Sequence, residues 1–129
     1  MPTPDQREVA ALLLRKATSD LTAARTLAAD PSQLDDVVGF HVQQAIEKGI
    51  KSVLAMRVVE VPRTHDLSYL VELVTGLGIP VPLSLDDAEQ LTSWAVAMRY
   101  EDIVSGLDRD TALATAGAAV TWAGEADGE

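Results

Sequence analysis

The sequence predicts an all-α protein, an antiparallel up-down helical bundle with four main helices and one short helix. Aromatic residues make up only 4% of its 129 residues, while alanine, leucine and valine dominate, as is typical of helical bundles. Apolar residues recur at helical spacing, and no strand-like alternation persists. Start and stop signals divide the chain into segments of helical length.

The first helix is expected from residue 4 to about residue 29. Thr3 suits the N-cap, Pro4 suits the first helical position, and Gln6 has the spacing of a capping box with Thr3. An inward stripe follows at helical spacing. Its members are Val9, Leu13, Ala17, Leu21, Ala24 and Ala28. Asp30 precedes a proline and so ends the helix, because that position avoids helical conformation.

The second helix is expected from Ser32, with Asp35 at the capping-box position, to about Glu60, before Val61 and Pro62 stop it. At about 1.5 Å per residue, each of the first two helices approaches about 40 Å. Helices of this length joined by a short turn are expected to pair as an antiparallel hairpin.

Three further helices complete the expected bundle. Thr64 is the expected cap of a short helix that Gly76 ends, and Ser84 with Asp87 begins a fourth helix that ends near residues 98–102. A last helix starts at about Asp108 and carries small residues that permit close approach. These inward residues are Ala112, Leu113, Ala116, Ala119, Val120 and Ala123. The acidic tail, 124–129, is expected to be disordered, which leaves one domain over residues 1–129 with a core from about 5 to 124.

Composition limits the compartment and the partners. The chain has no cysteine, no leader-like start and no apolar run near the roughly 18 residues that span a bilayer, so a cytoplasmic protein without membrane association is expected. Twenty acidic residues against ten basic ones give a net charge of −10. Such a chain repels phosphate backbones, which disfavours binding of bulk nucleic acid and favours a basic protein or a small ligand.

Familiar catalytic patterns are missing from the sequence. His41 and His65 are the only histidines and fall on different expected helices, so neither a metal site nor a required cofactor is predicted. The pair Gly76 and Gly78 lacks the spacing of a phosphate-binding loop. Ser68 is only a same-helix neighbour of His65, so no nucleophile and base pair follows from spacing. No catalytic residue is assigned.

Polar residues interrupt the apolar face of the second helix. On a helical wheel Gln43 falls in the same sector as Ile46 and Ile50, where an amide without partners costs about 1–3 kcal/mol. Gln43 is therefore expected to specify a contact, with another helix or with a second subunit. At the edge of that sector, Glu47 and Lys51 have the favourable i, i+4 order of a surface pair worth a few tenths of a kcal/mol.

Asp20 poses the same problem on the first helix, because it falls close to the apolar stripe. A half-buried carboxylate needs a cation or several donors. The expected role is structural pairing, and four partners remain open: His41, His65, Lys48 and Arg99.

Three segments together resemble a known family. They are FHVQQAIEKGIKSVL at 40–54, PRTHDL at 62–67 and MRY at 98–100. In this order they are similar to the HEPN domain, the higher eukaryote and prokaryote nucleotide-binding family, over nearly the whole chain. The resemblance implies an antiparallel helical bundle that commonly dimerises, which agrees with the helices expected above.

The resemblance also implies a function. Many members are metal-independent ribonucleases with an arginine, four to six residues and then a histidine, a spacing that this chain lacks. The likeness is closer to stand-alone members that act beside a minimal nucleotidyltransferase, in a toxin–antitoxin-like or substrate-presenting role. It implies a non-catalytic homodimer that binds a nucleotide, such a partner, or both. The cleft residues it implies are Gln43, Gln44, Lys48, Lys51, His65, Asp66, Arg99 and Tyr100.

Two alternatives remain beside this expectation. One is an RNA-cleaving toxin with an atypical site, such as His65 with Arg99. The other is a purely structural dimerisation module without a ligand.

Overall fold

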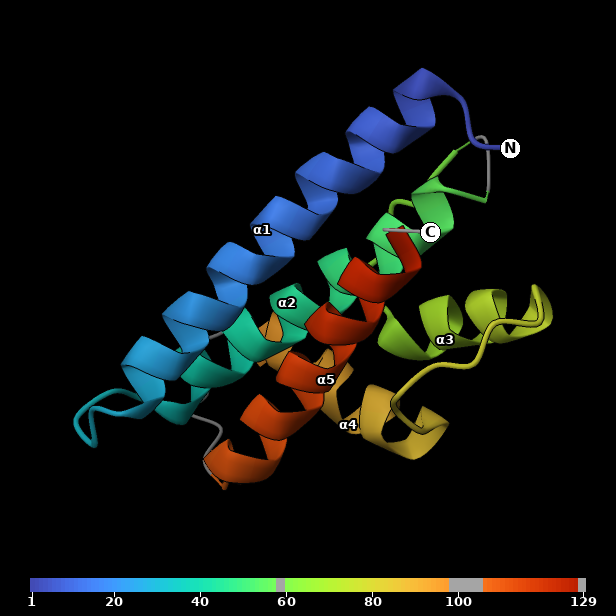
Figure 1. Ribbon diagram of the computed structural model, residues 1–129. Coiled ribbons are helices and arrows are strands. Elements are labelled where there is room, and N and C mark those ends of the chain that lie inside the picture. The colour runs from blue at the N-terminus through green and yellow to red at the C-terminus, as the bar shows by residue number, and fades with distance from the viewer. Residues whose placement is uncertain (58–59, 98–105, 128–129) are drawn as a thin grey trace.

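The computed structural model describes residues 1–57, 60–97 and 106–127, and within these ranges the chain forms five helices and no strand. The helices are α1 (Pro4–Ala28), α2 (Asp35–Ala55), α3 (Leu67–Gly76), α4 (Leu85–Ala97) and α5 (Arg109–Asp127). Figure 1 shows α1 and α2 as an antiparallel pair, with α5 beside them in the direction of α2. The all-α prediction is confirmed. No helix within these ranges is long and apolar enough to cross a membrane.

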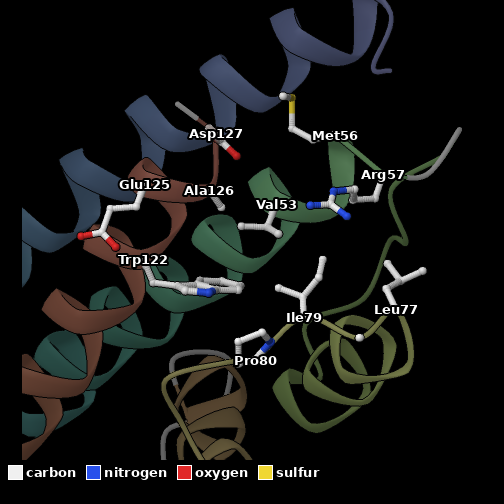
Figure 2. A pocket seen from close by; sticks show the side chains of 11 residues that line it. Val53, Met56, Arg57, Leu77, Ile79, Pro80, Trp122, Glu125, Ala126 and Asp127 are labelled. Carbon is white, nitrogen blue, oxygen red and sulfur yellow. The ribbon is translucent and has the colours of Figure 1, made fainter. Parts of the chain in front are cut away.

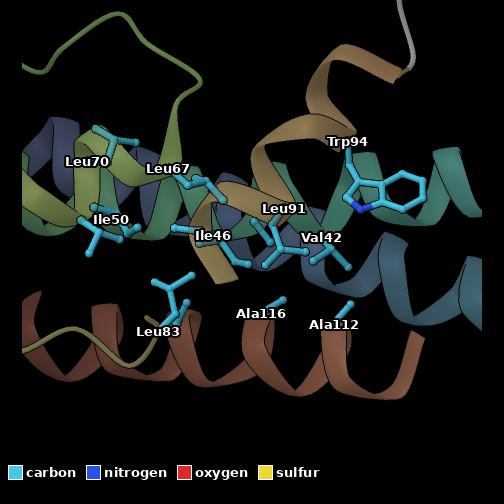
Figure 3. Packing of buried hydrophobic residues seen from close by; sticks show 14 of the residues in the cluster. Val42, Ile46, Ile50, Leu67, Leu70, Leu83, Leu91, Trp94, Ala112 and Ala116 are labelled. Carbon is cyan, nitrogen blue, oxygen red and sulfur yellow. The ribbon is translucent and has the colours of Figure 1, made fainter. Parts of the chain in front are cut away.

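Helix α2 is the centre of the bundle and packs against each of the other helices. Its apolar side chains meet α3 and α4 on one side and the alanines of α5 on the other (Figure 3). A Cβ at Gly49 would stand 3.5 Å from the Ala119 carbonyl oxygen, so the absent side chain lets α2 and α5 approach closely. The predicted small face of α5 is confirmed by its buried residues, Ala112, Ala116, Ala119 and Ala123.

Helix α1 begins as the sequence predicts. The Thr3 hydroxyl accepts a hydrogen bond from the Gln6 amide at 3.1 Å, and Gln6 Oε1 accepts one from the Thr3 amide at 2.7 Å, which completes the capping box. The buried stripe differs at its start, because Ala10 is buried while Val9 is 44% exposed. Ala17, Leu21 and Ala24 are buried as expected.

The predicted capping box at the start of α2 is wrong. Helix α2 begins at Asp35, after a Leu34 N-cap that offers no side-chain hydrogen bond. Ser32 instead closes the turn, since its amide and hydroxyl both donate to Asp30 Oδ1, at 2.9 and 2.7 Å. The helix also ends earlier than expected, at Ala55 rather than near residue 60.

Asp35 has a long-range role that spacing did not indicate. Its carboxylate accepts from the amides of Gly106 and Leu107, at 3.1 and 3.3 Å, and from Arg109 Nε at 2.9 Å. The Arg109 guanidinium also donates to three carbonyl groups of the α1–α2 turn, those of Ala28, Asp30 and Gln33. Burial opposes ionisation of Asp35, but these hydrogen bonds together lower its pKa. These contacts hold the start of α5 against the α1–α2 hairpin.

The caps of the later helices confirm one prediction and correct another. Ser84 Oγ accepts from the Asp87 amide at 3.1 Å, as expected for the start of α4. The N-cap of α3 is Asp66 and not Thr64, since Asp66 Oδ1 accepts from the amides of Ser68 and Tyr69. Asparagine, aspartate and serine are the strongest N-caps.

Helix α5 continues to Asp127, four residues beyond Ala123, where the sequence suggested a disordered tail. Asp127 Oδ2 is hydrogen-bonded to the hydroxyl of the buried Ser52 on α2. This contact and the burial of Ala123 hold the last turn against the bundle.

Candidate functional site

The buried amide on α2 has all its partners within the chain. Gln43 is 0% exposed, and its Nε2 donates to Glu47 Oε1 at 3.1 Å and to the His65 carbonyl at 3.0 Å. Its Oε1 accepts from Gln44 Nε2 at 2.7 Å. The partners lie on α2 itself and in the segment that precedes α3, where the sequence suggested another helix or a second subunit. We call Gln43, Gln44, Glu47, Lys51 and His65 the α2–α3 network.

Glu47 is the anionic centre of the α2–α3 network. Its residue exposure is only 3%, although the sequence suggested an edge position and a surface pair with Lys51. Besides the bond from Gln43, the carboxylate receives Lys51 Nζ at 3.1 Å and lies 2.8 Å from His65 Nδ1. The Lys51 side chain is only 12% exposed, so this ion pair is largely buried. The surface-pair interpretation is corrected: the pair satisfies a buried carboxylate.

His65 is fixed by this carboxylate but stays in reach of solvent. Its side chain is 55% exposed, against 4% for that of Glu47. With Nδ1 donating to Glu47, the other ring nitrogen, Nε2, is left to accept a hydrogen bond, or to donate one when the ring is protonated. The arrangement presents one oriented polar group at the junction of α2 and the segment before α3.

Asp20 forms a second polar cluster, on the α1 side of α2. Its Oδ2 accepts from Lys48 Nζ at 2.6 Å, and its Oδ1 lies 3.1 Å from His41 Nδ1. Of the three candidate partners that the structure describes, His41 and Lys48 contact Asp20, whereas His65 contacts Glu47. Lys48 therefore pairs with a residue of α1 and is not part of the α2–α3 network. The expected structural pairing of Asp20 is what the geometry displays.

The remaining cleft candidates divide into two groups. Asp66 follows His65 directly, and its carboxylate caps α3. It also borders a shallow hollow between α3 and α4, whose acidic members are Asp66, Glu72, Asp86 and Glu89. Arg99 and Tyr100 lie outside the described residues, as does the end expected for the fourth helix. Of the six predicted cleft residues that the structure describes, it brings together four in the α2–α3 network: Gln43, Gln44, Lys51 and His65.

Metal-ion ligands are not clustered in the part of the chain that the structure describes. Among residues 1–57, 60–97 and 106–127, no group of three or more histidine, cysteine, aspartate or glutamate side chains is placed to hold one. Within the same ranges, the only lysine or arginine in the α2–α3 network is Lys51, which is already paired.

Sequence reasoning missed two features of the structure. The burial of Glu47 was missed because a helical wheel places it at an edge and does not show that His65, 18 positions along the chain, approaches its carboxylate. A pocket between the ends of α2 and α5, bordered by Arg57, Trp122 and Asp127, was also missed. The unusual Trp122 in an alanine-rich helix was the available signal.

A comparison with models of protein families matches the HEPN domain over residues 10–125. No curated protein and no solved structure matches the chain. The matched range includes α2, the segment around His65 and nearly all of α5.

Proposed function

Because the chain belongs to the HEPN domain family, we propose that it is a non-catalytic, dimeric helical module that binds a partner minimal nucleotidyltransferase, a nucleotide, or both. The role is toxin–antitoxin-like or substrate-presenting. The observation that carries the proposal is the presentation of His65 by a buried carboxylate.

The α2–α3 network supports binding over catalysis. Gln43, Glu47 and Lys51 satisfy one another, so their polar groups serve to position His65. The His65 side chain is 55% exposed, and when the ring is protonated its Nε2 donates in a direction that the Glu47 contact fixes, which suits a phosphate or a carboxylate of a partner. Among the described residues, no second unpaired acid, base or cation of the network stands beside it to complete a reaction.

The charge next to His65 supports a protein partner over bulk RNA. Asp66 and the other acidic residues of the α3–α4 hollow give this face negative charge, in keeping with the net charge of −10. Such a surface attracts a basic protein surface and repels a polyphosphate backbone. A single mononucleotide carries far less charge than an RNA chain and remains compatible with His65.

The two sequence features that suggested a dimer do not supply its interface, so another surface is needed. The Gln43 amide and the alanine face of α5 are both occupied inside the chain. Support comes instead from the outer face of α1, where Val9 and Leu12, one turn apart, are each 44% exposed. Sedimentation at micromolar concentration tests this step, and a monomer there would contradict it.

Thermal unfolding with ATP or GTP tests ligand binding. A ligand at 100 times its Kd stabilises the folded state by about 2.7 kcal/mol. We expect this stabilisation to be lost in His65→Ala and kept in His41→Ala, the matched control on the other polar cluster. Mixing with a minimal nucleotidyltransferase encoded beside this chain tests the protein partner by size-exclusion chromatography. If nucleotides gave no stabilisation and no complex formed, the proposal would be overturned.

A second candidate function rests on the Glu47–His65 contact itself. A histidine whose Nδ1 is held by a carboxylate has the arrangement of a general base, and Nε2 is then free to accept the proton of a ribose hydroxyl. Incubation with total RNA in the presence of a chelator separates the two functions. Metal-independent cleavage that disappears in His65→Ala and persists in His41→Ala would favour this ribonuclease over the binding module.

A further inference from the structure

A pocket of about 360 Å³ lies at the opposite end of α2 from its Asp35 start, between that helix, the α3–α4 connection and the end of α5. We call it the α2–α5 pocket. Figure 2 shows the Trp122 indole on its floor, with Val53 above it and Ile79 and Pro80 across from it. The volume is in the range of small-molecule sites, and the lining combines apolar side chains with three charged ones, those of Arg57, Glu125 and Asp127.

Arg57 supplies the positive group of the α2–α5 pocket. It follows the end of α2, and Figure 2 shows its guanidinium pointing into the pocket. It forms no ion pair with any carboxylate in the part of the chain that the structure describes. A guanidinium in this position is suited to receive a carboxylate through two parallel hydrogen bonds.

Asp127 supplies an acceptor with spare capacity. Its Oδ2 is hydrogen-bonded to the Ser52 hydroxyl, whose single hydrogen is donated either to this oxygen or to the Ala10 carbonyl, 2.8 Å from Ser52 Oγ. Its Oδ1 is buried and has no hydrogen-bond partner among the described residues. Burial raises the pKa of Asp127, although the Ser52 hydrogen bond opposes the rise. Ionised or protonated, the carboxyl group can still accept an N–H at Oδ1.

These two groups border the same pocket without pairing with each other. A purely apolar ligand would leave both unsatisfied, and burying an unpaired polar group is costly. A simple cation would face the Arg57 guanidinium, while a simple anion would leave Asp127 Oδ1 without a donor. A ligand with both charges satisfies both groups.

We propose that the α2–α5 pocket binds a small zwitterion in which a carboxylate meets Arg57, an ammonium group donates to Asp127, and an apolar body packs on Trp122. Apolar or aromatic α-amino acids belong to this chemical class. The pocket is distinct from the α2–α3 network, so this site stands whether or not His65 binds a nucleotide or a partner.

Three probes with the same aromatic body test the charge requirement: phenylalanine, phenethylamine and phenylpropanoate. Isothermal titration calorimetry on the full chain is expected to give a Kd for phenylalanine at least about tenfold lower than for either singly charged probe. Equal or tighter binding of phenethylamine or phenylpropanoate would overturn the proposal, as would no binding of phenylalanine at millimolar concentration.

Three variants test the assignment of the groups. Arg57→Gln and Asp127→Asn are each expected to weaken phenylalanine binding about tenfold or more. Glu72→Gln is the matched control, because this exposed carboxylate of α3 is not among the residues that line the pocket. Arg57 is exposed at the helix end, so its replacement is expected to leave circular dichroism unchanged. Unaltered binding in a folded Arg57→Gln variant would refute the site even if Asp127→Asn were unstable.

Discussion

Replacing Glu47 by alanine tests whether its carboxylate belongs to a buried network or to a surface ion pair. If Glu47 and Lys51 were an ordinary helix pair, the loss would be a few tenths of a kcal/mol. In the structure the carboxylate is 3% exposed and receives Gln43, Lys51 and His65 at 2.8–3.1 Å. Its removal leaves one buried amide hydrogen of Gln43 and the largely buried Lys51 ammonium without an acceptor.

The magnitude follows from which of these partners can regain water. The His65 ring is 55% exposed and rehydrates at little cost. The amide hydrogen of Gln43 costs about 1–3 kcal/mol when unsatisfied. Removing one partner of a buried ion pair costs about 3–5 kcal/mol. Since Lys51 keeps 12% exposure, we take the lower part of both ranges and expect Glu47→Ala to lower the free energy of unfolding by about 4–5 kcal/mol.

Urea denaturation followed by far-UV circular dichroism measures this loss. Glu72→Ala, an exposed residue of α3, is the control and should lie within about 0.5 kcal/mol of the parent. Adding Lys51→Met to Glu47→Ala removes the uncompensated charge and should restore more than about 1 kcal/mol. A loss below about 1 kcal/mol for Glu47→Ala would refute the buried network and return the pair to the surface role.

Two further predictions concern packing and pH. A Cβ at Gly39 would lie 2.5 Å from Trp94 Cδ2, whereas at Gly49 the nearest atom is 3.5 Å away. Gly39→Ala should therefore destabilise the fold by about 1–2 kcal/mol net of its helix propensity. Gly49→Ala should be neutral or stabilising in the same urea assay. Equal stabilities would contradict the close approach of α4 to α2. Because the pKa of Asp35 is lowered in the folded state, its stabilisation is present above the ordinary value of 3.8 and is lost as pH falls through the folded value. Asp35→Asn should thus lose less stability than the parent between about pH 5 and about pH 3, and parallel pH profiles would argue against the bonds to Arg109.

Local sequence determined the helical class and most helix starts. The Thr3 capping box, the Ser84 cap and the alanine spacing of α5 all act within a few residues, so a linear pattern contains the groups that interact. Where two local patterns compete, the sequence alone misleads. Ser32 donates to Asp30 instead of capping α2, and Asp66 caps α3 while the Thr64 hydroxyl accepts from the Asp66 amide.

The sequence also identified Gln43 and Asp20 as polar residues that need partners, and its likeness to the HEPN family was confirmed by the match over residues 10–125. It did not identify the partners themselves. Gln43 meets a carbonyl 22 positions away, and Asp20 meets a lysine 28 positions away. Helical periodicity gives the direction of a side chain from its own axis and says nothing about which other helix stands there.

Only the tertiary structure decided which polar groups are buried together. Asp35 and Arg109 are 74 positions apart, and Ser52 and Asp127 are 75 apart, yet each pair is joined once α5 packs along α2. That packing also places Arg57 and Asp127 on the lining of one pocket, and the approach of the segment before α3 brings His65 to the buried Glu47. Helix formation depends on neighbours in the chain, whereas desolvation depends on what the other helices cover, and that is fixed only when the bundle closes.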